Sequence, residues 1–428
     1  MEQSEVPVHP DPAPTSSGRP WGSAALVGLV LALLQIWVVL TPDTVELDQE
    51  ELYNAAHAWE LLQGHFGDLF VLQYRRFCGG CSLDALLGAA VFSMLAPSFF
   101  AWKLVPISFT VLLGVVGFVH LHRRVGPWSA WVFAMVLAFP PQAWGLQSLV
   151  AWGNHYESGV LISISLLCLP PPTESNHKAS FGSGACMAVA LWCSFSATFG
   201  AFGLFALLVQ RRSVSTLLCW VAGLALVVVP WGLQWHSTGS LPFGTIYEAG
   251  YSTPDLTRIP DKVFSLLAPQ QLAGLFGIRQ AWLGLFLAVG WLISLATACR
   301  GVRTAPHIVR QAAGLFALWI TIYLVVGFRV NVPEWPLVPD GSSLRYAAPV
   351  YPLLFVIVAV QGVRAWQTQR PLRAALILLP VFLSGLVGRA DLHRHESART
   401  GAFRLGAADY DYFRTQASDV LSAERHSE

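Results

Sequence analysis

Long apolar segments recur along the whole chain and constrain its fold more than any other feature. Each is as long, or nearly as long, as a helix that crosses a hydrocarbon core of about 30 Å. The 428 residues are 54% hydrophobic and only 12% charged, too few polar groups to cover a water-soluble globule. The sequence therefore predicts an all-α, polytopic transmembrane protein, whose apolar segments are 24–40, 101–121, 128–144, 157–169, 185–209, 214–235, 281–299, 312–328, 346–363 and 374–387.

Charge divides the connecting loops into two sets. Loops rich in Lys and Arg face the cytoplasm, and here they are 122–124, 178, 211–212, 300–310 and 364–373. The outer loops, which hold nearly all the acidic residues of the membrane part, are then 41–100, 147–157, 236–280 and 329–345. If Lys178 and Arg211 both face the cytoplasm, segment 185–209 crosses twice and turns near Thr198. The sequence thus predicts about eleven spans.

One membrane domain is expected between two polar ends. Residues 1–20 are rich in Pro and Ser and predict a disordered cytoplasmic tail, followed by an uncleaved signal anchor. Residues 21–388 form the transmembrane domain, and 389–428 form a short polar tail outside. A net charge of +1 gives no global basic field for nucleic acid. Compact loops and the absence of an Asn-x-Ser/Thr sequon indicate a bacterial cytoplasmic membrane.

A cluster of carboxylates opens the first outer loop. Glu46, Asp48, Glu50 and Glu51 lie at the start of a segment whose apolar residues recur at helical spacing. Such a helix can lie on the membrane surface with its apolar side down. Acids favour the first turn of any helix through the macrodipole, which is one interpretation. Four of them beside lipid favour a functional cluster that binds a cation or accepts a proton. The apolar positions are Leu52, Ala55, Ala56, Trp59 and Leu62.

The same loop continues with a glycine turn and a second apolar stretch, 83–95. This stretch is too short for a confident span, so we predict a juxtamembrane or re-entrant helix. Cys78 and Cys81 have C-x-x-C spacing on an oxidising face, which fits a structural disulfide, a redox motif or half of a metal site. The disulfide is the favoured interpretation, and no second C-x-x-C completes a zinc site.

The order of these features resembles the GT-C superfamily of integral-membrane glycosyltransferases, which includes protein O-mannosyltransferases and lipid A aminoarabinose transferases. The resemblance covers most of residues 20–365. Members commonly carry adjacent Asp and Glu four and three residues before the tyrosine, where this chain has Gln49 and Glu50, with Asp48 displaced by one. The identity of the base, and even catalytic activity, therefore stay open. The matching motifs are the anchor, the acidic cluster with Tyr53, the glycines before 83–95, Lys103 leading into a span, and Arg345-Tyr346-x-x-Pro349-x-Tyr351-Pro352.

The resemblance implies an inverting transfer of a sugar from a polyprenyl-phosphate donor to an envelope glycan, lipid or protein at the outer membrane face. Such an enzyme needs no nucleotide site, and the sequence has neither a GxGxxG fingerprint nor a P-loop. A carboxylate must take the acceptor proton. Asp48 is the first candidate, with Glu46 and Glu50 beside it. Asp48 and Glu50 could also hold a divalent cation, Mg or Mn, since both ions prefer oxygen ligands.

The leaving lipid phosphate requires positive charge at the outer interface. Arg345 is the best-placed cation, because a guanidinium binds phosphate oxygens in pairs. The alternative is that Arg345 only snorkels at a helix end. Further candidates are Arg329, Lys262 and Arg258.

A second group of polar residues lies in the loop before segment 157–169. The resemblance implies that Asn154, His155 and Glu157 line the cavity and contact acceptor or metal, whereas a lone interfacial histidine is more often simply hydrogen-bonded. Tyr53, and Tyr247 in the long outer loop, are candidate substrate contacts.

Two other functions fit the same spans. A transporter or lipid flippase needs polar or broken helices near the bilayer midplane and internal symmetry, and neither is visible in this sequence. A noncatalytic scaffold for envelope assembly would bind the lipid-linked sugar without releasing the lipid phosphate. The glycosyltransferase hypothesis instead requires Asp48 and Arg345, from opposite ends of the chain, to share one lipid-accessible pocket.

Overall fold

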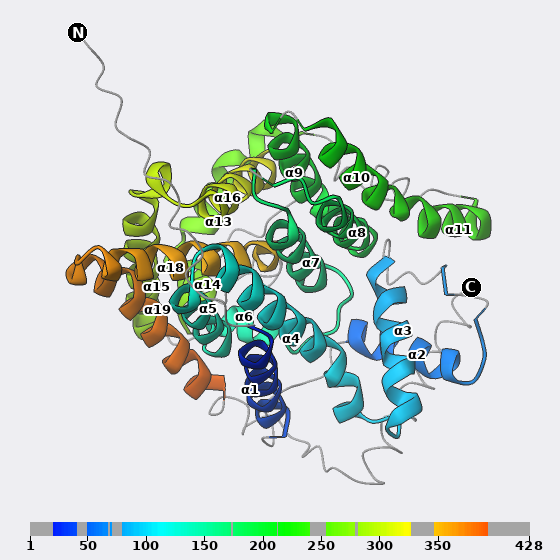
Figure 1. Ribbon diagram of the computed structural model, residues 1–428. Helices are drawn as coiled ribbons and strands as arrows, with labels where there is room; N and C mark the ends of the chain where they lie inside the picture. Colours follow the sequence, from blue (N-terminus) through cyan, green and yellow to red (C-terminus); the bar gives the residue numbers. More distant parts are fainter. Residues whose placement is uncertain are drawn as a thin grey trace.

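The computed structural model describes residues 20–40, 49–66, 69–70, 79–172, 174–211, 213–239, 254–278, 281–326 and 346–392. These parts are helices joined by short turns, with one isolated β-bridge between Pro254 and Val326 (Figure 1). The predicted all-α class is confirmed. The first half contains α1 (Trp21–Leu40), α2 (Gln49–Leu62), α3 (Gly79–Met94), α4 (Phe99–Arg124), α5 (Pro127–Ala138), α6 (Gln142–Gln147), α7 (His155–Cys168), α8 (His177–Cys193) and α9 (Thr198–Gln210). The second half contains α10 (Val214–Leu224), α11 (Val228–Thr238), α13 (Ile259–Leu267), α14 (Pro269–Phe276), α15 (Ala281–Cys299), α16 (His307–Val325), α18 (Tyr351–Gln367) and α19 (Pro371–Leu392).

Seven helices of the described part are long and apolar enough to cross a membrane, so the chain is a multi-pass membrane protein. The four other crossings expected from the sequence coincide with shorter helices, α5, α7, α8 and α9, of 12, 14, 17 and 13 residues. The count of eleven therefore stays a prediction. The seven spans are Trp21–Leu40, Phe99–Arg124, Val214–Ser237, Trp282–Cys299, His307–Val325, Ala348–Gln367 and Pro371–Ala390.

The apolar segment 185–209 breaks where the charge pattern required a turn. Helix α8 ends at Cys193, a 3-10 turn (η1) covers Phe195–Ala197, and α9 begins at Thr198. Ser194 is extended, and its hydroxyl oxygen accepts a hydrogen bond from Ser196 N at 3.3 Å. A serine side chain that competes for backbone hydrogen bonds ends the first helix and starts the turn.

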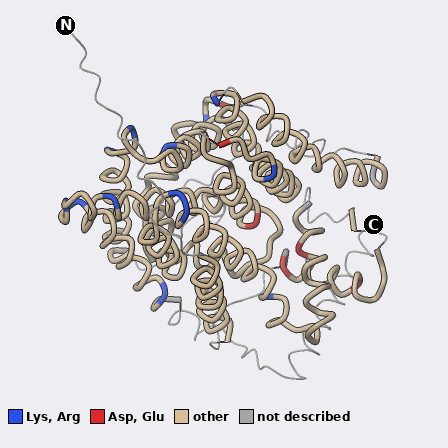
Figure 2. Tube along the Cα trace, in the orientation of Figure 1, with Lys and Arg blue, Asp and Glu red and all other residues tan. Residues whose placement is uncertain are grey.

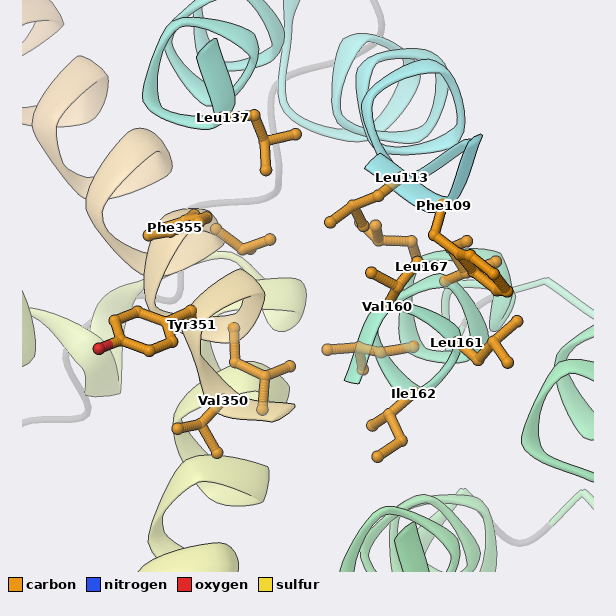
Figure 3. Packing of buried hydrophobic residues seen from close by; sticks show 14 of the residues in the cluster. Phe109, Leu113, Leu137, Val160, Leu161, Ile162, Leu167, Val350, Tyr351 and Phe355 are labelled. Carbon is orange, nitrogen blue, oxygen red and sulfur yellow. The ribbon is translucent and has the colours of Figure 1, made fainter. Parts of the chain in front are cut away.

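Helix α18 lies at the centre of the bundle. Its span is 94% buried, and it packs against α5, α15, α16 and α19. Figure 3 shows Leu113, Leu137, Val160 and Phe355, from four different helices, in the space between them. The span Val214–Ser237, by contrast, is 22% buried. A helix that is apolar on all sides suits a core, whereas a poorly buried apolar helix suits lipid.

Three of the predicted cytoplasmic turns lie together. The guanidinium of Arg124 donates to Leu169 O, and that of Arg211 donates to Pro170 O. Arg123 lies 5.6 Å from the ring centre of Trp21 at the start of α1. The ends of α4, α7 and α9 and the start of α1 are therefore close to one another, as a shared membrane side would require. Figure 2 shows acidic residues on α2, α3 and α7 grouped away from most of the basic helix ends.

Candidate active site

Helix α2 carries the only described part of the acidic cluster, and it packs against α3. Of its predicted apolar positions, Ala55 and Ala56 are fully buried, whereas Leu62 is 38% exposed and Trp59 is half-buried. Glu51 and Asn54 are fully buried as well, because both side chains have protein partners.

Glu51 forms a buried ion pair with Lys103 near the start of α4. Lys103 Nζ lies 2.7 Å and 2.8 Å from the two carboxylate oxygens, and both side chains have no solvent exposure. The same carboxylate accepts a hydrogen bond from Ala151 N at 3.0 Å. Asn54, one turn further along α2, donates to Ala151 O at 3.1 Å. Both backbone groups of Ala151 are thus bound by α2.

The glycine turn before α3 lies against the second outer loop. A Cβ atom on Gly80 would stand 1.3 Å from Gly153 O, so only glycine fits there. Gly153 has a φ of +70°, a backbone conformation that residues with a side chain rarely adopt. Cys81 is disulfide-bonded, as the favoured interpretation requires, and Cys78 lies outside the described residues. The Sγ atom of Cys81 lies 3.9 Å from Trp152 O. The two outer loops therefore touch along their backbones.

The second outer loop ends in α7, whose first turn holds the predicted polar residues. Asn154 caps the helix, its side-chain oxygen accepting from His155 N. Glu157 is fully buried, as is Asp84 on α3. The start of α7 thus brings a second acidic position beside the first outer loop.

The late Arg-Tyr motif reaches the same place. The rings of His155 and Tyr346 meet edge to face with centres 4.6 Å apart. Gly159 packs tightly on Pro349, where an added Cβ would stand 2.5 Å from the proline Cα. Tyr346 follows Arg345 directly in sequence. Glu51, three residues after Asp48, therefore contacts the loop of residues 151–155, and so does Tyr346, directly after Arg345.

Several predicted site residues lie outside the part of the chain that the structure describes, and their roles stay predictions. For Glu50 the backbone is described, in the first turn of α2, but not the side chain. Tyr53 is buried beside His57, with ring centres 4.4 Å apart, and His57 Nδ1 lies 3.2 Å from a Glu60 oxygen. The predicted residues outside the described part are Glu46, Asp48, Tyr247, Arg329 and Arg345.

Two of the predicted phosphate ligands have protein partners in the structure, and their phosphate role stays a prediction. Lys262 is fully buried and donates to Tyr323 O at 2.9 Å and to Val326 O, so it caps the carboxyl end of α16. Burial lowers the pKa of its amine to about 8. Arg258 Nε lies 2.8 Å from an Asp255 oxygen, and hydrogen bonds from Thr257 and Arg258 lower the pKa of that carboxyl.

Replacing Lys262 with Met should loosen this attachment. The carbonyls at the end of α16 would lose their charged donor, which costs about 1–3 kcal/mol. We expect lower thermal stability and faster proteolysis between residues 254 and 262. Arg258→Gln is the matched control, because its partly exposed ion pair is screened by solvent and contributes little to stability. Equal proteolysis rates in the Lys262 variant and the native protein would contradict the capping role.

The sequence motifs do not predict how Lys103 and Asn54 are used. Lys103 belongs to the family motif, and an ionisable residue in an apolar segment is itself a signal of function. Asn54 and Asp84 gave no signal beyond their polarity. Among the described residues, no group of three or more His, Cys, Asp or Glu side chains is arranged to hold a metal ion. The side chains of the predicted ligands Asp48 and Glu50 lie outside the described part of the chain.

Neither protein-family profiles nor curated proteins give a match to this sequence. Solved structures do. ArnT from Cupriavidus metallidurans matches in the apo state with a TM-score of 0.59 and 13% identity, over 88% of this chain and 77% of ArnT. The crystal structure of ArnT bound to undecaprenyl phosphate matches with a TM-score of 0.58 and 13% identity, over 94% and 76%.

A more distant likeness is to the oligosaccharyltransferase AglB from Archaeoglobus fulgidus in complex with an inhibitory peptide and a dolichol-phosphate. Its TM-score is 0.44 at 14% identity, over 92% of this chain and 59% of AglB. At identities this low, a structural match shows a shared fold and does not show shared site residues. The chain thus has the fold of ArnT, so the resemblance expected from the sequence holds at the level of the fold.

Proposed function

We propose that this protein is a membrane glycosyltransferase that moves a sugar from a polyprenyl-phosphate donor to an envelope acceptor at the outer face of the cytoplasmic membrane. One observation carries the proposal. In a fold shared with ArnT, which has been crystallised with undecaprenyl phosphate, the start of α2, the loop 151–155 and Tyr346 meet at the end of the bundle opposite the basic turns. A lipid-linked donor and a polar acceptor can meet at such an interface.

The chemistry asks for a carboxylate beside the sugar. The acceptor hydroxyl loses its proton to the base, its oxygen bonds to the anomeric carbon, and the bond from that carbon to the phosphate oxygen breaks. We assign the base to Asp48, with Glu46 and Glu50 beside it. Glu51 is a poor base because both of its oxygens are held by Lys103. A base must reach the proton that it takes.

The leaving lipid phosphate would be met by Arg345, which precedes Tyr346 beside His155. Arg329 is the second cation for this role. Asp48 and Glu50 could together hold Mg or Mn, whose charge would help to neutralise the phosphate. His155, Glu157 and Asn154 would line the acceptor side. Where little water is present, such contacts stabilise the charge that develops in the transition state more than they would in water.

The proposal is tested with purified protein in liposomes, a panel of radiolabelled undecaprenyl-phosphate sugars and an envelope extract as acceptor. We expect one donor to label the acceptor and to release undecaprenyl phosphate in equal amount. Folded protein that consumes no donor in the panel would refute the assignment. Donor binding without release of the lipid phosphate would instead support a noncatalytic scaffold, the function to which Gln49 in the usual acidic position points.

A further inference from the structure

We propose that Glu51, Asn54 and Lys103 form a clamp that positions the two halves of the site and takes no part in bond making. The clamp joins the start of α2, the start of α4 and residue 151 of the second outer loop. The expected effect of the clamp on sugar transfer rests on the proposed function, whereas its expected effect on hydrogen–deuterium exchange does not. The role of Glu51 thereby differs from that assigned to the other three acids of the cluster, Glu46, Asp48 and Glu50.

Geometry excludes Glu51 from the chemistry. Its oxygens lie 2.7 Å and 2.8 Å from Lys103 Nζ, and one of them also accepts from Ala151 N at 3.0 Å. Neither side chain has any exposed surface. A carboxylate whose oxygens are bound by an ammonium and an amide cannot also approach a substrate hydroxyl.

The same contacts explain how distant segments are held in register. Glu51 and Asn54 are one helical turn apart, and they bind the N–H and the C=O of a single residue, Ala151. Lys103 supplies the charge that lets Glu51 stay buried, and its Nζ also lies 5.2 Å from the ring centre of Phe99. The start of α2 and the polar start of α7 are therefore both fixed to α4.

A double-mutant cycle separates positioning from chemistry. Lys103→Met leaves a buried carboxylate without its cation, whereas Glu51→Gln together with Lys103→Met removes both charges and keeps an oxygen for Ala151 N. For each variant we would measure thermal stability, kcat and KM for the donor, and hydrogen–deuterium exchange of residues 149–157. Lys103→Arg, which keeps the positive charge, is the conservative variant.

We expect Lys103→Met to raise exchange at 149–157 and to lower kcat at least tenfold, with a smaller change in KM. The Glu51→Gln/Lys103→Met protein should recover protection and most of the lost kcat, with the pH profile of the native protein. A folded, protected double variant without activity would overturn the clamp, because Glu51 or Lys103 would then act in the reaction. Unchanged exchange in Lys103→Met would overturn it equally.

A control in the same fold guards against general destabilisation. Gln361→Leu removes a buried hydrogen bond of 3.1 Å to Ala298 O, between α18 and α15. Its exchange at 149–157 should match that of the native protein; an increase there would mean that the segment responds to any core defect, and would overturn the clamp. If the native protein transferred no sugar at all, the proposed function would fail while the exchange measurements still decided the clamp.

Discussion

Changing Glu46, Asp48 and Glu50 together to their amides should abolish sugar transfer while leaving the protein folded. The amides keep the size of the side chains but can neither accept the acceptor proton nor bind a cation strongly. Loss of a general base lowers turnover by about a hundredfold or more. The measurement is kcat for release of undecaprenyl phosphate, with the donor identified in the panel.

Single changes then assign the base. Asp48→Asn should account for most of the loss, and Glu50→Gln for less, if Asp48 takes the proton. Glu174→Gln is the control, since Glu174 is an exposed acid in the loop between α7 and α8, on the predicted cytoplasmic side. Native turnover in the triple variant would remove the acidic cluster from the mechanism and with it the assignment of the site.

Replacing Gly80 with Ala should disrupt the outer end of the bundle. The added methyl would stand 1.3 Å from Gly153 O and 2.2 Å from Gly153 C, and a backbone cannot rotate away as a side chain can. Overpacking in a core typically costs about 1–3 kcal/mol, and we expect the upper end or more here. We also expect loss of transfer, because the second outer loop carries Asn154, His155 and Glu157. Thermal unfolding and kcat would be measured on the same samples.

Gly182→Ala is the matched control. Gly182 lies inside α8 with nothing within 4 Å of the added methyl, so the substitution should be neutral or stabilise by up to about 1 kcal/mol. A Gly80→Ala protein that unfolds at the native temperature and transfers sugar normally would show that the two loops do not meet as described.

Local sequence patterns determined most of the helical framework. Apolar length and the alternation of basic and acidic loops depend on neighbouring residues and on the bilayer, so they can be read without a tertiary structure. The break in segment 185–209 shows this well: charge on both flanks required a turn near Thr198, and α9 begins at that residue. The short helix at 83–95 was predicted on the same grounds and is part of α3.

Tertiary structure alone decided which polar residues are used, and for what. Helical spacing placed Leu62 among the apolar positions of α2, yet it is 38% exposed, whereas Glu51 and Asn54 are buried because Lys103 and Ala151 offer them partners. Lys262, expected at a phosphate, caps α16. A hydrogen bond between residues far apart in sequence depends on how helices pack, and no local pattern records that. The composition of a segment determines whether it is buried as an apolar helix, whereas the packing of the helices determines which polar side chains pair.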